Sequence, residues 1–342
     1  MLTNAPDKSV VIYRLGSLGD TLVALPCFHL IAQAFPDARR LVLTNQPVAS
    51  NAAPLGVILG ESGLIDGTIA YPVRLRSIAG LAGLWRDLRR VRADTLVYLT
   101  ANRGALAVAR DYAFFRLCGF RRVIGLPWTE DLRKNRTSAA GTLEPEARRL
   151  ARTLAVLGEV DLDDPASWDL GLTSSERAAG DAAVHGLAPG RFIVVNTGGK
   201  AVEKDWGEAR WTSLLKRLGE RLPGYGLLFV GAREDADRAA RLALGWRGLV
   251  VNACGALSPR QSAAAMTSAA LFVGHDSGPL HLAAAVGLPC VGLFGDYNRP
   301  AMWHPVGARH HIIHEMRGVE AISEEQVMQA IDAALAWTAV RG

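Results

Sequence analysis

Short apolar runs alternate with longer amphipathic segments along the whole chain. The runs are rich in Val, Ile and Leu, as buried strands are, whereas the segments between them carry apolar residues at helical spacing. In residues 77–91, for example, Leu84, Leu88 and Val91 share one face and arginines occupy the other. This alternation predicts parallel sheets flanked by helices. The predicted strands cover residues 9–14, 41–44, 64–71, 95–99 and 122–124, then 191–197, 226–231, 249–251, 271–273 and 290–294.

The pattern stops and restarts once, which predicts two domains. Residues 158–172 are acidic, contain Pro165 and show no clear period, as expected of a linker. A length of 342 residues also favours two cores over one. We therefore expect α/β domains over residues 1–165 and 166–320. Residues 321–342 predict an amphipathic helix that packs back on the first domain, with apolar side chains every four residues at Val327, Ile331 and Leu335.

The stretch 271–296 predicts a strand, a tight turn, a helix, a second turn and a strand. Pro279 suits the first turn of the helix, where its missing N–H costs nothing. The free N–H groups of such a helix point beyond the end of the strand, at a natural phosphate site. An ordinary βαβ packing unit remains the alternative. A ligand site is favoured because polar residues gather in this apolar stretch, namely His275, Asp276, Ser277 and His281.

The first strand leads into a glycine-containing turn that ends at Asp20, before a predicted helix over residues 21–35 interrupted early by Pro26. The turn has neither the Gly-Lys-Ser/Thr of a Walker A loop nor the glycine spacing of a dinucleotide fingerprint. Asp20 could cap the helix, or it could project from the end of the strand into a cleft. Two such halves predict two Rossmann-like domains whose strand ends face a cleft. Asp20 would then meet Lys204 and Asp276 across it.

The positive charge of the chain lies in its first half. Residues 1–165 hold 21 Lys and Arg against 16 Asp and Glu, and residues 166–342 hold 17 of each, which accounts for the net charge of +5. An anionic partner would explain this imbalance, whether a phosphorylated substrate, an anionic membrane surface or nucleic acid. The alternative is a solvated arginine-rich face. Nucleic acid is disfavoured because no aromatic residues interleave a basic stripe.

Other compositional features limit the function classes. No uncharged run is long enough to span a membrane, and the N-terminus lacks the layout of a signal peptide. The four cysteines are scattered, as reduced core residues of a cytoplasmic protein are. His310 and His314 have the i, i+4 spacing of a helical metal pair, but their segment alternates like a strand and lies near the end of the chain. We therefore expect no metal site.

Several motifs, in the right order, resemble glycosyltransferase family 9, the bacterial lipopolysaccharide heptosyltransferases. The run from Arg14 to Asp20, Arg-Leu-Gly-Ser-Leu-Gly-Asp, is similar to the N-terminal signature of the family. Asp-Ser-Gly-Pro-Leu-His at 276–281, with Gly-Leu-Pro at 287–289 and Leu-Phe-Gly at 293–295, resembles its C-terminal signature. The loop with Lys204 and Trp206, and the Gly231-Ala232 turn with its acidic residues, resemble two further family segments.

The resemblance implies a GT-B fold, with an acceptor-binding N-terminal domain and a donor-binding C-terminal domain. It also implies an inverting transfer from ADP-heptose, without metal or cofactor, to a lipopolysaccharide-core or other phosphorylated glycan, in the cytoplasm or at the inner membrane. Asp20 matches the proposed general base. The implied donor residues are Lys204 at the diphosphate, Ser277 and Gly278 at the phosphates, Asp276 at the sugar, Asp235 near the nucleoside, and Thr197 and His281. Arginines of the basic half would dock the acceptor, among them Arg86, Arg89, Arg133 and Arg136.

Three departures from the family pattern bear on donor specificity. Gly-Asp-Tyr at 295–297 replaces a Gly-Pro-Thr run, His275 stands where small residues are usual, and Gly198-Gly199 replaces more polar residues. Two other functions remain open. A GT-B-like nucleotide-sugar epimerase or hydrolase would need no acceptor and no basic half. A nonenzymatic nucleotide-sugar-binding protein would not need Asp20.

Overall fold

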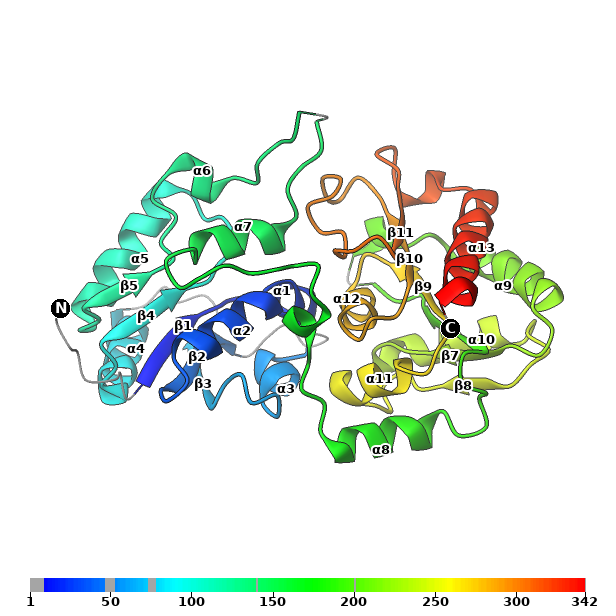
Figure 1. The fold of residues 1–342 in the computed structure, drawn as a ribbon, viewed down its shortest axis with the longest axis horizontal. Helices are drawn as coiled ribbons and strands as arrows, with labels where there is room; N and C mark the ends of the chain where they lie inside the picture. The colour runs from blue at the N-terminus through cyan, green and yellow to red at the C-terminus, as the bar shows by residue number, and fades with distance from the viewer. Residues whose placement is uncertain (1–8, 47–52, 73–77, 140, 200, 342) are drawn as a thin grey trace. The chain divides into compact units, whose positions relative to one another are not determined.

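The computed structural model describes residues 9–46, 53–72, 78–139, 141–199 and 201–341. The chain divides into two compact units, Met1–Gly171 and Leu172–Gly342 (Figure 1). The boundary expected after residue 165 thus lies at Gly171. The difference arises because the predicted linker is partly ordered, with a short 3₁₀ turn over Pro165–Trp168 whose Asp164 side chain accepts from the Ala166 N–H.

The first unit contains a parallel sheet in the order β3-β2-β1-β4-β5. The strand order reverses between β1 and β4, so side chains beyond the carboxyl ends of these two strands occupy the usual ligand position of such sheets. Leu99, just after β4, donates its N–H to the Tyr13 carbonyl at the end of β1. The strands are β1 (Ser9–Tyr13), β2 (Arg39–Gln46), β3 (Gly67–Pro72), β4 (Thr95–Tyr98) and β5 (Arg122–Ile124).

Helices connect these strands, as the alternating pattern predicts. The helix expected over residues 21–35 is in fact two, because Ala24 ends α1 and also begins α2, with Pro26 in the first turn of α2. Leu84 and Leu88 of α4 pack with Val108 and Phe115 of α5 in one hydrophobic cluster with the sheet. The helices are α1 (Leu18–Val23), α2 (Leu25–Ala34), α3 (Leu55–Leu59), α4 (Ile78–Val91), α5 (Ala105–Leu117), α6 (Glu130–Arg133) and α7 (Glu146–Thr153).

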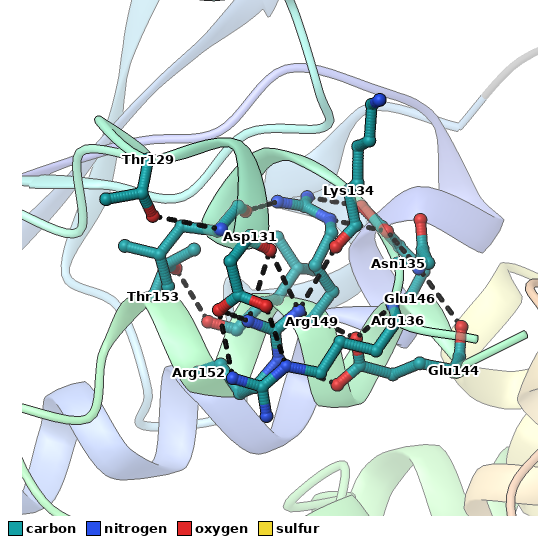
Figure 2. A network of polar contacts seen from close by, with 12 residues as sticks. Thr129, Asp131, Lys134, Asn135, Arg136, Glu144, Glu146, Arg149, Arg152 and Thr153 are labelled. Carbon is teal, nitrogen blue, oxygen red and sulfur yellow. Dashed lines mark hydrogen bonds and ion pairs between the residues drawn. The ribbon is translucent and has the colours of Figure 1, made fainter. Parts of the chain in front are cut away.

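A fully buried arginine anchors the segment between β5 and α7 (Figure 2). Arg149 of α7 binds both carboxylate oxygens of Glu146, at 2.8 and 2.5 Å. Its other N–H groups donate to the carbonyls of Leu132, at 3.1 Å, and Thr100, at 3.0 Å. The guanidinium therefore ties α6 and the end of β4 to α7, and its charge is balanced inside the unit.

A second set of ion pairs closes the same segment (Figure 2). Arg152 binds the Glu144 carboxylate at 2.8 and 2.7 Å and also contacts Asp131. Asp131 in turn accepts two hydrogen bonds from Arg136, at 2.8 and 2.9 Å. The segment that holds Arg133 and Arg136 is thus fixed by local ion pairs, because most of its charged side chains pair with one another or with α7.

The second unit contains a parallel sheet in the order β11-β10-β9-β6-β7-β8. Its strand order reverses between β6 and β9, which pair from Ile193 with Leu271 to Asn196 with Gly274. The carboxyl ends of β6 and β9 therefore lie side by side at the switch point of this sheet. The strands are β6 (Phe192–Asn196), β7 (Gly226–Phe229), β8 (Val250–Asn252), β9 (Leu271–His275), β10 (Cys290–Phe294) and β11 (His311–His314).

Two clusters of apolar side chains involve this sheet. One joins it to α9 and α13, and the other to α11 and α12. The terminal helix was expected to pack back on the first domain. It instead contacts β9, β10, β11 and α9, because Val327 and Ile331 are fully buried in the core of the second unit. The helices are α8 (Ser174–Ala183), α9 (Glu208–Arg221), α10 (Ala236–Ala243), α11 (Pro259–Met266), α12 (Gly278–Ala285) and α13 (Glu324–Arg341). Of the helices in the described ranges, not one combines the length and apolar character needed to cross a bilayer.

Replacing Glu146 by Gln should destabilise the protein by about 3–5 kcal/mol, because Arg149 would keep a buried charge without its counter-charge. The free energy of unfolding can be measured by urea denaturation. Glu130→Gln is the matched control, since it makes the same chemical change in an exposed pair with Lys134 and should leave the stability nearly unchanged. Equal effects of the two substitutions would contradict the structural role of Arg149.

Candidate functional site

An ion pair lies at the switch point of the second sheet, where β6 and β9 end. Asp276 directly follows β9 and is 8% exposed, and its N–H donates to the Leu293 carbonyl of β10. Lys204 closes a short 3₁₀ turn over Val202–Lys204. Its Nζ lies 2.7 Å from Asp276 Oδ2 and 3.4 Å from the Asp276 carbonyl. The structure therefore brings together two of the predicted donor residues.

The segment after β10 covers this pair. The Asn298 amide donates to the same Asp276 Oδ2 that Lys204 contacts. The Lys204 ammonium also lies 4.4 Å from the centre of the Tyr297 ring, within the range of a cation–π contact. Tyr297 belongs to the Gly-Asp-Tyr departure, and Asn298 follows it directly. The departure thus touches Lys204, and the residue after it touches Asp276.

The N-terminus of α12 opens beside the ion pair. Ser277 is the N-cap residue, yet its hydroxyl does not cap the helix. It donates instead to Asn196 Oδ1 at 2.9 Å, and the Asn196 amide donates to the Val230 carbonyl at 2.9 Å. Ser277 is thus turned toward β6, and a helix N-terminus such as that of α12 carries N–H groups without intrahelical partners, which favour an anion.

His275 anchors the lysine loop to β9. Its Nε2 accepts hydrogen bonds from the Trp206 backbone N–H at 3.1 Å and from the Trp211 indole at 3.2 Å. Full burial lowers the pKa of His275 to about 4, so the imidazole is neutral at pH 7 and its proton is on Nδ1. Trp206 follows Lys204 by two residues. The histidine at this unusual position therefore helps to hold the Lys204 turn in place.

A second anchor holds the same loop from the side of α10. Arg238 binds both oxygens of Asp205, at 2.8 and 2.9 Å, and donates to the Thr197 carbonyl at 3.2 Å. Burial raises the pKa of Asp205, but the hydrogen bonds from Arg238 and from the Gly207 N–H, together with the charge of Arg238, lower it by more, so the net shift is downward. Thr197, a predicted donor residue, is buried at the end of β6. Lys204 is thus followed directly by two fixed residues, Asp205 and Trp206.

Asp235 lies beyond the end of β7, on the other side of β6 from β9. Its Oδ2 accepts from the Ala232 N–H at 2.8 Å, and burial raises its pKa. A Cβ at Gly198 or at Gly231 would collide with this carboxylate. The unusual Gly198 therefore has a steric reason, since it leaves room for Asp235 at the predicted nucleoside end of the site.

Histidines line the other flank of α12. His281 is buried in α12. Burial, followed by the neighbouring His314, lowers the pKa of His304 to about 4. His304 Nε2 lies 2.8 Å from His314 Nδ1, and His314 Nε2 lies 3.1 Å from the Asn298 carbonyl. As the sequence predicts, His314 belongs to a strand, β11. Within the described ranges, no group of three or more His, Cys, Asp or Glu side chains is arranged to hold a metal ion.

Asp20 of the first unit lies beyond the end of β1, as predicted. It is not the N-cap of α1; Ser17 is, and Asp20, the third helical residue, completes a capping box with Ser17. Its Oδ2 accepts from the Ser17 N–H at 2.8 Å and from the Ser17 hydroxyl at 3.1 Å. Gly16 has a φ of +140°, and a Cβ there would collide with the Asp20 side chain. The buried Arg14 donates to the Asp20 carbonyl.

The four arginines proposed for the acceptor lie in two separate places. Arg86 and Arg89 are exposed on α4. Arg133 donates to the carbonyls of Pro127 and Trp128, and Arg136 pairs with Asp131. The structure thus brings together the first pair of arginines on one helix. The second pair lies in the ion-paired segment before α7.

The sequence profile of glycosyltransferase family 9 (heptosyltransferase) matches residues 82–331, well over half of the chain. The chain belongs to glycosyltransferase family 9. Family membership makes the protein a glycosyltransferase enzyme. The polar residues at the ends of β6 and β9 lie within the matched range.

Similar proteins cover nearly the whole family 9 chain. Lipopolysaccharide heptosyltransferase 3 of Escherichia coli is 24% identical over 308 residues, which cover 84% of this chain and 83% of that protein. The glycosyl transferase family 9 structure from Veillonella parvula DSM 2008 matches with a TM-score of 0.73 and 21% identity, over 98% of this chain and 99% of that chain. Escherichia coli heptosyltransferase WaaC, solved with ADP-2-deoxy-2-fluoro heptose, matches with a TM-score of 0.64 and 20% identity, over 95% and 99%. These likenesses confirm the predicted GT-B fold class.

Sequence reasoning missed several residues of the family 9 site. Asn196 bridges Ser277 to the end of β7, and its signal was a polar residue closing an apolar run. Arg238 and Asp205 bind each other but lie 33 residues apart in sequence, so no local pattern predicts their contact. Asn298 contacts Asp276 and directly follows the Gly-Asp-Tyr departure at 295–297. That departure was the sequence signal that could have indicated Asn298.

His275→Gln should flatten the dependence of stability on pH. The folded pKa of about 4 lies below the ordinary value of 6.5, so neutral His275 contributes stability above pH 6.5 that is lost as the pH falls towards 4. The substitution should remove up to about 3 kcal/mol of that loss, measured by urea unfolding across this range. His185→Gln replaces an exposed imidazole and is the control. An unchanged slope in His275→Gln would refute the buried, neutral state.

Proposed function

We propose that this enzyme transfers a heptose or related sugar, with inversion, from ADP-heptose to a lipopolysaccharide-core or other phosphorylated glycan. One observation carries the proposal: Lys204, Asp276 and the N-terminus of α12 converge at the switch point between β6 and β9. A cation and a helix N-terminus are what a departing diphosphate requires. The relatives, lipopolysaccharide heptosyltransferase 3 and a heptosyltransferase solved with an ADP-heptose analogue, support the donor.

On the donor side, we propose that Lys204 and the N-terminus of α12 at Ser277 and Gly278 take the diphosphate. In the free enzyme Asp276 neutralises Lys204, and a diphosphate would compete for the ammonium. Asp276 repels phosphate, so its partners would be sugar hydroxyls. Release of Lys204 would leave Asp276 held by Asn298 and free to accept those hydroxyls. The charge on the lysine and the helix N-terminus would do the work of a metal ion, with no cofactor required.

The remaining donor residues surround this centre. We propose that Asp235 and Thr197 face the nucleoside end, because they lie at the ends of β7 and β6. His281, buried in α12, would support the phosphate end. Tyr297 would shape the sugar end, since its ring already contacts Lys204. This assignment makes the Leu172–Gly342 unit the donor-binding domain.

On the acceptor side, we propose Asp20 as the general base. Both hydrogen bonds from Ser17 go to Oδ2, so Oδ1 is the oxygen that would take the proton of the acceptor hydroxyl. Removing that proton as the anomeric carbon is attacked is what an inverting transfer requires of one base. The first unit would then bind the acceptor, with the Arg86–Arg89 pair and the Arg133–Arg136 pair as its anionic docking points. An anionic glycolipid acceptor would bring the cytoplasmic enzyme to the inner membrane.

Lys204→Ala should weaken ADP binding about tenfold or more, a loss of about 1.4 kcal/mol, because the diphosphate would lose its cation. Isothermal titration calorimetry in a buffer with EDTA measures this and also tests binding without metal. Lys216→Ala, on the exposed side of α9, is the matched control and should bind ADP as the wild type does. Unchanged ADP affinity of Lys204→Ala, or loss of wild-type binding in EDTA, would refute the donor assignment.

Asp20→Asn should lower kcat by roughly 10²–10⁴, because an amide cannot take the proton of the acceptor hydroxyl. The stability should change little, since the amide oxygen still accepts from Ser17 and keeps the capping box. ADP affinity should also survive, because the donor residues belong to the other unit. The measurements are single-turnover sugar transfer, thermal unfolding and calorimetry on one preparation. A near-normal kcat would show that Asp20 is only a capping residue.

A further inference from the structure

One side of α4 carries an exposed apolar stripe that the enzyme's chemistry does not use. Ile78 is 87% exposed, Leu81 40% and Trp85 38%. These residues follow one another at i, i+3 and i+7, so they form one line along the helix. The buried face of α4 is a different line, made by Leu84 and Leu88. The exposed stripe is therefore a second apolar surface on a helix already fixed to the sheet.

The stripe continues onto the end of α5. The Trp85 indole donates to the Leu117 carbonyl at 3.1 Å, which brings the two helices together at this point. Leu117 ends α5 and is itself 72% exposed. Large apolar side chains exposed singly are normal on a protein surface, but a line of them on adjoining elements marks an interaction surface. Ile78, Leu81, Trp85 and Leu117 are called the α4–α5 surface below.

Arginines border this surface. Arg89 continues the stripe, and its guanidinium lies 5.1 Å from the centre of the Trp85 ring. Other arginines are exposed on the same two elements, whereas α4 has a single acidic residue, Asp87, which pairs with Arg90. The bordering arginines are Arg86, Arg89, Arg90 and Arg116.

We propose that the α4–α5 surface docks on an anionic phospholipid membrane. Charge complementarity selects this occupant, because exposed Trp, Ile and Leu enter the interfacial layer while arginines meet lipid phosphates. The indole of Trp85 is of the kind that gathers at the membrane interface. A second copy of the chain would bring the same arginines face to face, and like charges would oppose it. The inference rests on the membrane contact of the proposed function and assigns it to named residues.

The experiment is co-sedimentation of the full chain with vesicles. Binding should be strong on phosphatidylglycerol vesicles and weak on phosphatidylcholine vesicles. Raising the salt from about 0.1 M to about 1 M should reduce it, because the Debye length falls from about 10 Å to about 3 Å. The double variant Ile78→Asp with Leu117→Asp should bind phosphatidylglycerol vesicles about tenfold or more weakly.

A matched control separates this surface from general apolar exposure. Leu244→Asp changes a leucine of the second unit that is 87% exposed, as Ile78 is, and vesicle binding should stay at the wild-type level. ADP affinity and thermal unfolding show that the double variant is folded, and neither depends on the membrane.

Equal vesicle binding by the double variant and the wild type would overturn the proposal. So would light scattering that shows a wild-type dimer broken by the double variant, because the occupant would then be a second copy. ADP binding does not depend on vesicle binding. Failure of the donor assignment can therefore be distinguished from failure of the membrane proposal.

Discussion

The pairing of β6 with β9 is the constraint on which the second unit depends. These strands are distant in sequence but adjacent in the sheet, and because they are parallel their carboxyl ends meet at one edge. The adjacency brings Asn196 against Ser277, and Lys204, in the turn that follows β6, against Asp276. The polar contacts around the Lys204–Asp276 pair lie at this edge or on the elements beside it. The chemistry is therefore a consequence of strand order.

The departures from the family pattern fit one another in space. His275 accepts two hydrogen bonds that hold the loop of Lys204, and Gly198 leaves room for the carboxylate of Asp235. Tyr297 and the neighbouring Asn298 contact the Lys204–Asp276 pair. A histidine in place of a small residue needs partners when it is buried, and the two tryptophans supply them. These residues form the surroundings of the Lys204–Asp276 pair.

The first unit uses its arginines in two ways. Arg149 and Arg152 are paired inside the unit and act as structural ties between the segment after β5 and α7. Arg86 and Arg89 are exposed on α4, beside apolar side chains that no core covers. The positive charge of the first half is therefore a sum of contributions with different physical roles. Among the described residues, the exposed arginines are better placed to meet an anionic partner than the buried Arg149.

The sequence by itself determined the α/β class, the two units and the strands, because apolar periodicity reflects local burial. It also predicted Asp20, Lys204 and Asp276, since motif residues follow strand ends. Only the tertiary structure decided the unit boundary at Gly171, the packing of α13 on its own unit, and the capping box that Asp20 forms with Ser17. Arg238 with Asp205 and Asn298 with Asp276 were beyond sequence reasoning. Such pairs depend on which strands and loops become neighbours, and the hydrophobic pattern of each segment carries no information about its partner.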